Sequence, residues 1–211
     1  MTPWGVGSYE GPGGREPWEI SHEEIQRDMG TASKTLAELG VGPGQRVLFC
    51  SMLSEAGQFW PLIVGAMLSG AQLSCADATE SEAVRVAMFT RLIEYRAVLG
   101  VTPAILDGLD ALGHPYADVF AGIEVIGARP GAYERLRAAG LSPRRFVLCG
   151  PAVAIADAPD APALVSASEW EIAGDGDRVV VTGRRERATT FERTHTAVRG
   201  DVVGNGVVWR T

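Results

Sequence analysis

The residues best suited to chemistry lie near the start of the chain, in a glycine-rich stretch. The segment GSYEGPGGREP, residues 7–17, contains Gly11, Gly13, Gly14 and Arg15 shortly before a helix signal. A glycine-rich loop that enters a helix can bind phosphate, because its backbone N–H groups are free and the helix N-terminus is electropositive. Arg15 could add a positive charge to such a site. The segment is therefore a phosphate loop, a degenerate form of one, or a flexible leader.

Other chemistries find little support in the sequence. His22, His114 and His195 are far apart, and none has a partner at the spacing of metal ligands. No G-x-S-x-G segment marks a nucleophile elbow, and no G-x-G-x-x-G segment follows a predicted strand. We therefore assign no catalytic residue and no metal ligand from the residue pattern.

Composition limits the classes of partner. The net charge of −7 and the pI of about 5.0 argue against binding to nucleic acid or to an anionic membrane surface. The first residues do not resemble a signal peptide, and no apolar run reaches the roughly 18 residues of a membrane span. Cys50, Cys75 and Cys149 lie far apart in apolar runs, which is typical of buried free thiols. We therefore expect a cytoplasmic protein.

Strand and helix signals alternate up to about residue 150. Ser21 and Glu24 form a capping box for a helix over residues 21–39, Thr79 and Glu82 form a second capping box, and Thr102 caps a later helix. The predicted strands are 46–51, 71–76, 96–101, 123–128 and 145–150, and the predicted helices between them are 55–69, 79–95, 102–112 and 130–139. Such alternation implies right-handed crossover connections and a mainly parallel sheet.

The pattern changes after residue 150. Residues 152–163 are rich in Ala, Pro and Asp and predict a connecting loop, whereas residues 169–182 and 201–209 predict two hairpins. We therefore predict an α/β fold, with a mainly parallel sheet and helices on both faces, followed by a small β-rich C-terminal part. The predicted division is a glycine-rich leader over residues 1–20, an α/β body over 21–151, and a linker with a β-rich tail over 152–211.

The order of these elements resembles that of the adenylate-forming superfamily of acyl-CoA synthetases, and within it that of phenylacetate–CoA ligases. The resemblance is carried by SHEEIQRDMGTASKTLAELGVGPGQRVLF, RLIEYRAVLGVTPAILDGL and DRVVVTGRRERATTFERTHTAVRGDVV, and spans roughly residues 7–203. It implies that GSYEGPGGREP stands in the place of the ATP phosphate loop. It also implies that Asp201, in VRGDVV, stands in the place of the ribose-binding aspartate.

The sequence departs from the family's pattern at three places. Ser8 alone remains of the hydroxyl cluster of the phosphate loop, and Glu10 adds a negative charge there. The adenine-stacking, metal-holding segment that the family places after the strand ending at Gly150 is replaced by PAVAIADAP. The chain ends soon after Val203, so we expect the C-terminal domain with its catalytic lysine to be absent. Lys34, the only lysine, lies within a predicted helix and cannot replace it.

These departures predict a truncated protein that binds without catalysing adenylation. No cofactor is expected, although weak AMP or ATP binding through Gly11, Gly13, Gly14, Arg15 and Asp201 is compatible with the resemblance. The expected partner is a small acyl or aryl acid, or another protein. Two alternatives stay open: an AMP-forming acyl- or aryl-CoA ligase with reduced or partner-completed machinery, and an unrelated small α/β protein.

The fold class also predicts where a ligand binds. In doubly wound sheets, ligands lie outside the carboxyl ends of the strands. The residues expected near such a cleft are Ser51, Ala76, Thr102, Ala128 and Gly150. Phe59, Trp60 and Tyr95 either wall this cleft or belong to the core. The helix segment FWPLIVGAMLSG is apolar nearly all round, and the resembled family pairs through its N-terminal domains, so we expect a homodimer.

Overall fold

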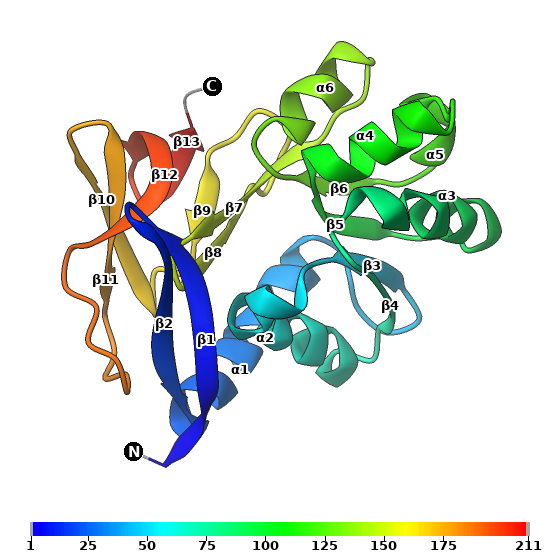
Figure 1. The fold of residues 1–211 in the computed structure, drawn as a ribbon. Coiled ribbons are helices and arrows are strands. Elements are labelled where there is room, and N and C mark those ends of the chain that lie inside the picture. Colours follow the sequence, from blue (N-terminus) through cyan, green and yellow to red (C-terminus); the bar gives the residue numbers. More distant parts are fainter. Residues whose placement is uncertain (1, 210–211) are drawn as a thin grey trace.

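The computed structural model describes residues 2–209 of the chain (Figure 1). Its strands are β1 (Pro3–Gly11), β2 (Gly14–Ser21), β3 (Arg46–Cys50), β4 (Gln72–Ala76), β5 (Ala97–Val101), β6 (Val125–Ala128), β7 (Arg144–Cys149), β8 (Ala152–Ile155), β9 (Ala163–Val165), β10 (Trp170–Asp175), β11 (Arg178–Gly183), β12 (Thr194–Val203) and β13 (Gly206–Trp209). Its helices are α1 (His22–Glu38), α2 (Ala56–Leu68), α3 (Ala83–Leu92), α4 (Pro103–Ala111), α5 (Tyr116–Val119) and α6 (Ala132–Ala138). Short 3-10 turns, η1 (Leu53–Glu55) and η2 (Glu80–Glu82), lead into α2 and α3. Residue 1 of the predicted leader and residues 210–211 of the predicted tail lie outside the described residues.

Five strands form the parallel part of the main sheet, as predicted from their apolar runs. Their order is β4-β3-β5-β6-β7, and each neighbouring pair is parallel. Leu48 packs with residues of α3 and α4, whereas Val47 and Phe49 pack with residues of α1 and α2. Helices therefore cover both faces of this part of the sheet (Figure 1), and burial on two sides explains the continuous apolar sequence.

The predicted helix caps are found at two of three positions. Ser21 Oγ accepts from the N–H of Glu24 at 3.2 Å while the Glu24 carboxylate accepts from the N–H of Ser21 at 2.8 Å, which completes the capping box of α1. Thr102 Oγ1 accepts from the N–H of Ile105 at the start of α4. Thr79 makes no such bond, because its hydroxyl pairs with that of Ser81 and the segment begins as the 3-10 turn η2.

The β-rich part continues the main sheet rather than standing apart from it. Strand β8 pairs antiparallel with β7, with Phe146 opposite Ile155, and β9, β13, β12, β11 and β10 follow in order. The prediction of a connecting loop over residues 152–163 is therefore wrong at its start. Ala152 and Ala154 are buried in the ladder, but alanine has a low β propensity and the nearby Pro and Asp residues indicate a loop.

The two predicted hairpins are confirmed. Strands β10 and β11 pair from Trp170 opposite Gly183 to Asp175 opposite Arg178. The sequence predicts Asn205 and Gly206 at the turn of the second hairpin. Strands β12 and β13 pair with Val203 opposite Gly206, so the turn lies one residue earlier, at Gly204 and Asn205.

The glycine-rich N-terminal segment is a β-hairpin, which corrects the prediction of a loop or leader. Strands β1 and β2 pair antiparallel up to Gly11 opposite Gly14, so the turn lies at the tip of the hairpin and not at the start of a helix. Tyr9 and Trp18 are buried on one side of the hairpin, with their rings 5.7 Å apart. The frequent glycines obscure this alternation in the sequence.

Two of the three cysteines are buried as expected. Cys50 and Cys149 are buried free thiols, whereas Cys75 is exposed on β4, which ends the sheet and has a neighbour on one side only. Burial raises the pKa of both buried thiols to about 12. Within residues 2–209, no helix is both long enough and apolar enough to cross a membrane.

Candidate functional site

Two neighbouring cavities share the side chain of Gln58. The first, which we call the hairpin cavity, has a volume of about 180 Å³. It is lined by the hairpin residues Ser8, Tyr9, Glu10 and Arg15, by Glu55 and Gln58 near the start of α2, by Arg129 and Pro130 after β6, and by Val147, Leu148 and Val198. It therefore lies at the carboxyl end of the parallel strands, the edge at which the fold class predicts a ligand.

A partly buried ion pair forms one wall of the hairpin cavity. Arg129 donates from both terminal nitrogens to the two carboxylate oxygens of Glu55, at 2.6 and 2.7 Å, and its guanidinium lies over the ring of Phe59. Burial alone raises the pKa of Glu55, but the hydrogen bonds and charge of Arg129 outweigh it and hold that pKa below its ordinary value. Glu55 is therefore ionised at neutral pH and neutralises Arg129.

A second ion pair lies on the hairpin. Arg15 Nε donates to Glu10 Oε1 at 2.8 Å, and both side chains are about half exposed. Gly11, Gly13 and Gly14 surround the turn beside this pair, and Gly14 has a φ of +118°, a backbone conformation that favours glycine. The structure therefore brings four of the predicted nucleotide-binding residues together at the hairpin tip.

Asp201 is not brought into that cluster. It lies exposed on β12, opposite Val208. The residue of β12 that lines the hairpin cavity is Val198. Its role in binding ribose stays a prediction. Two of the aromatic residues suggested as cleft walls, Phe59 and Tyr95, are core residues, since their side chains are almost completely buried.

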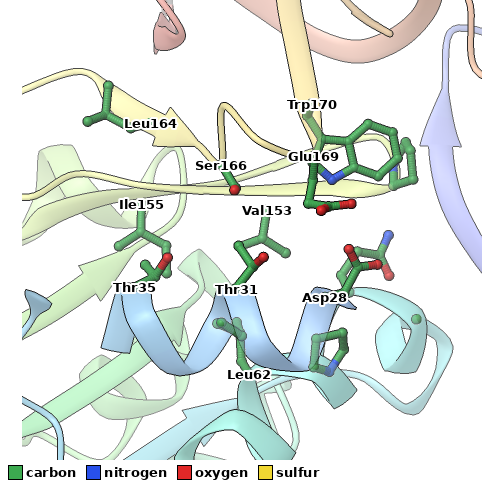
Figure 2. A pocket seen from close by; sticks show the side chains of 15 residues that line it. Asp28, Thr31, Thr35, Leu62, Val153, Ile155, Leu164, Ser166, Glu169 and Trp170 are labelled. Carbon is green, nitrogen blue, oxygen red and sulfur yellow. The ribbon is translucent and has the colours of Figure 1, made fainter. Parts of the chain in front are cut away.

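The second cavity, which we call the helix cavity, lies between helices α1 and α2 and the strands β8 to β10 (Figure 2). Its volume is about 70 Å³. Thr31, Thr35 and Asp28 line it from α1, and Ser166 and Glu169 line it from the β-rich part. The cavity is not predicted from the sequence, because α1 and the β-rich part that line it lie more than 100 residues apart in the chain. The only signal in the sequence is the run of polar residues at spacings of three and four along α1.

The side-chain amide of Gln58 uses its nitrogen for hydrogen bonds but not its oxygen. Its Nε2 donates to the carbonyl oxygens of Ser8 and Gly150, each at 3.1 Å. Because both partners are acceptors, the nitrogen must face them and the orientation of the amide is fixed. Its Oε1 is buried and has no hydrogen-bond partner among the residues that the structure describes.

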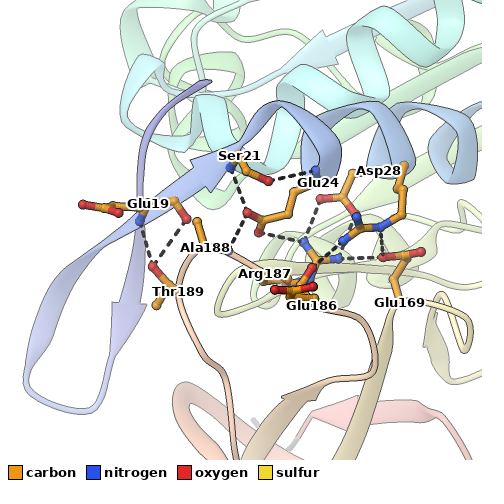
Figure 3. A network of polar contacts seen from close by, with 10 residues as sticks. Glu19, Ser21, Glu24, Asp28, Glu169, Glu186, Arg187, Ala188 and Thr189 are labelled. Atoms are coloured by element: carbon orange, nitrogen blue, oxygen red, sulfur yellow. Dashed lines mark hydrogen bonds and ion pairs between the residues drawn. The ribbon is translucent and has the colours of Figure 1, made fainter. Parts of the chain in front are cut away.

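A buried polar network borders the helix cavity (Figure 3). Arg187 donates to both carboxylate oxygens of Asp28, at 2.9 and 3.0 Å, and to Glu169 at 3.0 Å. Its guanidinium also lies 3.9 Å from the ring centre of Trp170. Burial alone lowers the pKa of Arg187, but the bonds and charges of its carboxylate partners raise it above its ordinary value.

The same network connects residues 186–188, which lie between β11 and β12, with the first turns of α1. Glu24, the capping residue of α1, accepts from the backbone N–H of Ala188 at 2.8 Å, and Arg187 lies 3.5 Å from its other oxygen. Arg27 donates to the carbonyl oxygen of Glu186 and lies 3.4 Å from Glu169. In the sequence, Arg187 is one of several charged residues in GRRERATTFER and is indistinguishable from a solvated surface arginine.

No protein-family model and no curated protein matches this sequence. Solved structures do match. The structure of 2-hydroxyisobutyryl-CoA ligase with 2-HIB-AMP and CoA superposes with a TM-score of 0.67 at 13% identity, covering 93% of this chain and 51% of that one. The N-terminal subdomain of Klebsiella oxytoca NpsA, in complex with 3-hydroxybenzoyl-AMSN, gives a TM-score of 0.66 at 12% identity over 98% of this chain and 61% of that one. A point variant of E. coli MenE with bound OSB-AMS gives a TM-score of 0.59 at 13% identity, over 99% of this chain and 48% of that one.

The chain therefore has the fold of the adenylate-forming acyl-CoA ligases, which confirms at the level of the fold the resemblance found in the sequence. It spans about half the length of 2-hydroxyisobutyryl-CoA ligase and of MenE. The finer likeness to phenylacetate–CoA ligases stays a prediction.

Proposed function

We propose that this protein binds a small molecule on the fold of the adenylate-forming ligases and does not itself form acyl-adenylates. One observation carries the proposal: both arginines of the hairpin cavity, Arg15 and Arg129, are held by carboxylates of the same cavity. Transfer from ATP depends on cations and hydrogen-bond donors that neutralise the charge of the phosphates. In this cavity that positive charge is already matched by Glu10 and Glu55.

Repulsion between the carboxylates of this cavity and the phosphates of ATP is large enough to oppose adenylation. Two unit charges about 4 Å apart near a protein surface interact by about 4 kcal/mol. A triphosphate placed against Arg129 would therefore be repelled by Glu55 with an energy similar to its attraction to Arg129. The lowered pKa of Glu55 keeps this carboxylate charged at neutral pH. AMP carries less charge than ATP, so weak AMP binding at the hairpin tip is compatible with this arrangement.

The ligands of the matched structures suggest which molecules to try. 2-HIB-AMP is bound to 2-hydroxyisobutyryl-CoA ligase, and 3-hydroxybenzoyl-AMSN to NpsA. A small acyl or aryl acid is therefore one proposed ligand, and a protein partner is another. We also propose a cytoplasmic location, because free thiols such as Cys50 and Cys149 persist in a reducing compartment.

Pyrophosphate exchange with a panel of acyl and aryl acids, ATP and Mg²⁺ tests the proposal. We expect no turnover above a heat-killed control, together with a rise in Tm for at least one small molecule in a thermal-shift screen. A Glu10→Gln variant, which releases Arg15, is expected to bind AMP a fewfold more tightly than the unmodified chain. Turnover that is lost in Asp201→Ala would overturn the proposal in favour of a ligase with reduced or partner-completed machinery.

A further inference from the structure

We propose that the helix cavity recognises an amine: the ligand of this protein places a short alkylammonium group, rather than a carboxylate, between α1, α2 and the strands β8 to β10. This inference rests on the proposed small-molecule binding function and names the chemical class of the ligand. It is carried by the charge of the cavity's border, by an unsatisfied acceptor and by the size of the space.

The border of the helix cavity carries an excess of negative charge. The network contains three carboxylates, those of Glu24, Asp28 and Glu169, and two guanidinium groups, those of Arg187 and Arg27. Two of the carboxylates, Asp28 and Glu169, line the cavity, whereas neither arginine does. Arg187 pairs with both of these carboxylates, so what remains is the one net negative charge of the whole network, which favours a cation over an anion.

Gln58 supplies an independent indication. It lines the cavity, its side chain is almost completely buried, and its Nε2 is committed to two carbonyl groups. Its Oε1 is left without a partner among the described residues, and a buried acceptor in that state costs about 1–3 kcal/mol. A ligand N–H would satisfy it, whereas a carboxylate, which only accepts, could not.

The remaining walls fix the size and the apolar part of the ligand. Leu62, Val153 and Ile155 supply apolar surface among the polar residues, and the hydroxyl groups of Thr31 and Ser166 are available as further acceptors (Figure 2). The volume of about 70 Å³ is well below the roughly 150 Å³ of a cavity that admits benzene. A short, unbranched aminoalkyl group fits these limits.

A series of ligands that differ only in their head group tests the inference on the full chain. Propylamine, propionate and 1-propanol are compared at constant ionic strength by thermal shift and by NMR titration, observing the Gln58 side-chain amide and the Trp170 indole. We expect propylamine to raise Tm and shift both signals, with an affinity at least tenfold above that of propionate. Equal or tighter binding of propionate, or the absence of any response to propylamine, overturns the inference.

Two variants locate the binding. Ser166→Met is expected to fill the cavity and abolish the response to propylamine, because Ser166 points into it (Figure 2). Ser81→Met, an equal enlargement at an exposed position, is expected to leave the response unchanged. Propylamine binding that survives in Ser166→Met would overturn the assignment to this cavity. If propionate binds in place of propylamine, the inference of an amine ligand fails and the proposed small-molecule binding function stands. If the protein forms acyl-adenylates, the proposed function fails, and the comparison of propylamine with propionate still decides the inference of an amine ligand.

Discussion

Arg187 shows how one side chain can join distant parts of the chain. Its side chain is 4% exposed, and its guanidinium binds carboxylates on α1 and just before β10. Replacing Arg187 with Met leaves Glu24, Asp28 and Glu169 without their shared cation in a buried setting. We expect a loss of about 3–5 kcal/mol in the free energy of unfolding, measured by urea denaturation.

The matched control for this variant lies two residues away. Arg185 is exposed, so Arg185→Met is expected to change the free energy of unfolding by no more than about 0.5 kcal/mol. Equal effects of the two variants would show that the Arg187 network does not stabilise the fold.

The pair of Glu55 and Arg129 makes stability depend on pH. The pKa of Glu55 is lower in the folded chain than in the unfolded one, so its contribution is present above the ordinary glutamate pKa of about 4.3 and is lost as pH falls through the folded value. We therefore expect wild type to exceed Glu55→Gln in stability at neutral pH and the difference to shrink in acid. Denaturation curves from neutral pH to pH 3 check this, and a difference that grows in acid would contradict it.

At the scale of elements, the sequence predicts the strands that are continuous apolar runs, and it does not predict features that depend on contacts between distant segments. Strands β3 and β5 are recognisable because burial on both faces leaves little room for polar residues. The hairpin of β1 and β2 is obscured by its glycines, and β8 by its alanines. The helix cavity and the Arg187 network depend on side chains from segments far apart in the chain, and no local pattern marks such pairs.

The hairpin is fixed to α2 by close contact around Trp18. A Cβ on Gly7 or on Gly57 would lie 2.6 Å from the Trp18 ring, whereas a Cβ on Gly5 would meet nothing within 4 Å. Gly7→Ala is therefore expected to destabilise the protein by about 1–3 kcal/mol, because the buried indole must move. Gly5→Ala in the same strand is expected to be near neutral. Thermal denaturation of both variants measures the contrast, and equal melting temperatures would rule out this packing.

At the scale of the whole molecule, exposed apolar side chains predict self-association. Met67 and Leu68, at the end of α2, are 60% and 69% exposed, and Leu53 and Leu92 are exposed to a similar or greater degree. Neighbouring apolar residues of this kind mark an interface more often than a solvated surface. We expect a homodimer that buries the end of α2, with a mass twice that of the chain in light scattering at micromolar concentration.

Charged substitutions at the end of α2 test this directly. The double variant Met67→Glu, Leu68→Glu is expected to be folded and monomeric, because a carboxylate cannot lose its water inside an apolar interface without a partner. Leu112→Glu, at an exposed apolar position after α4, provides the control and is expected to leave the dimer intact. A monomeric wild-type protein would contradict self-association. A dimer that persists in the double variant would instead place the interface on another surface of the molecule.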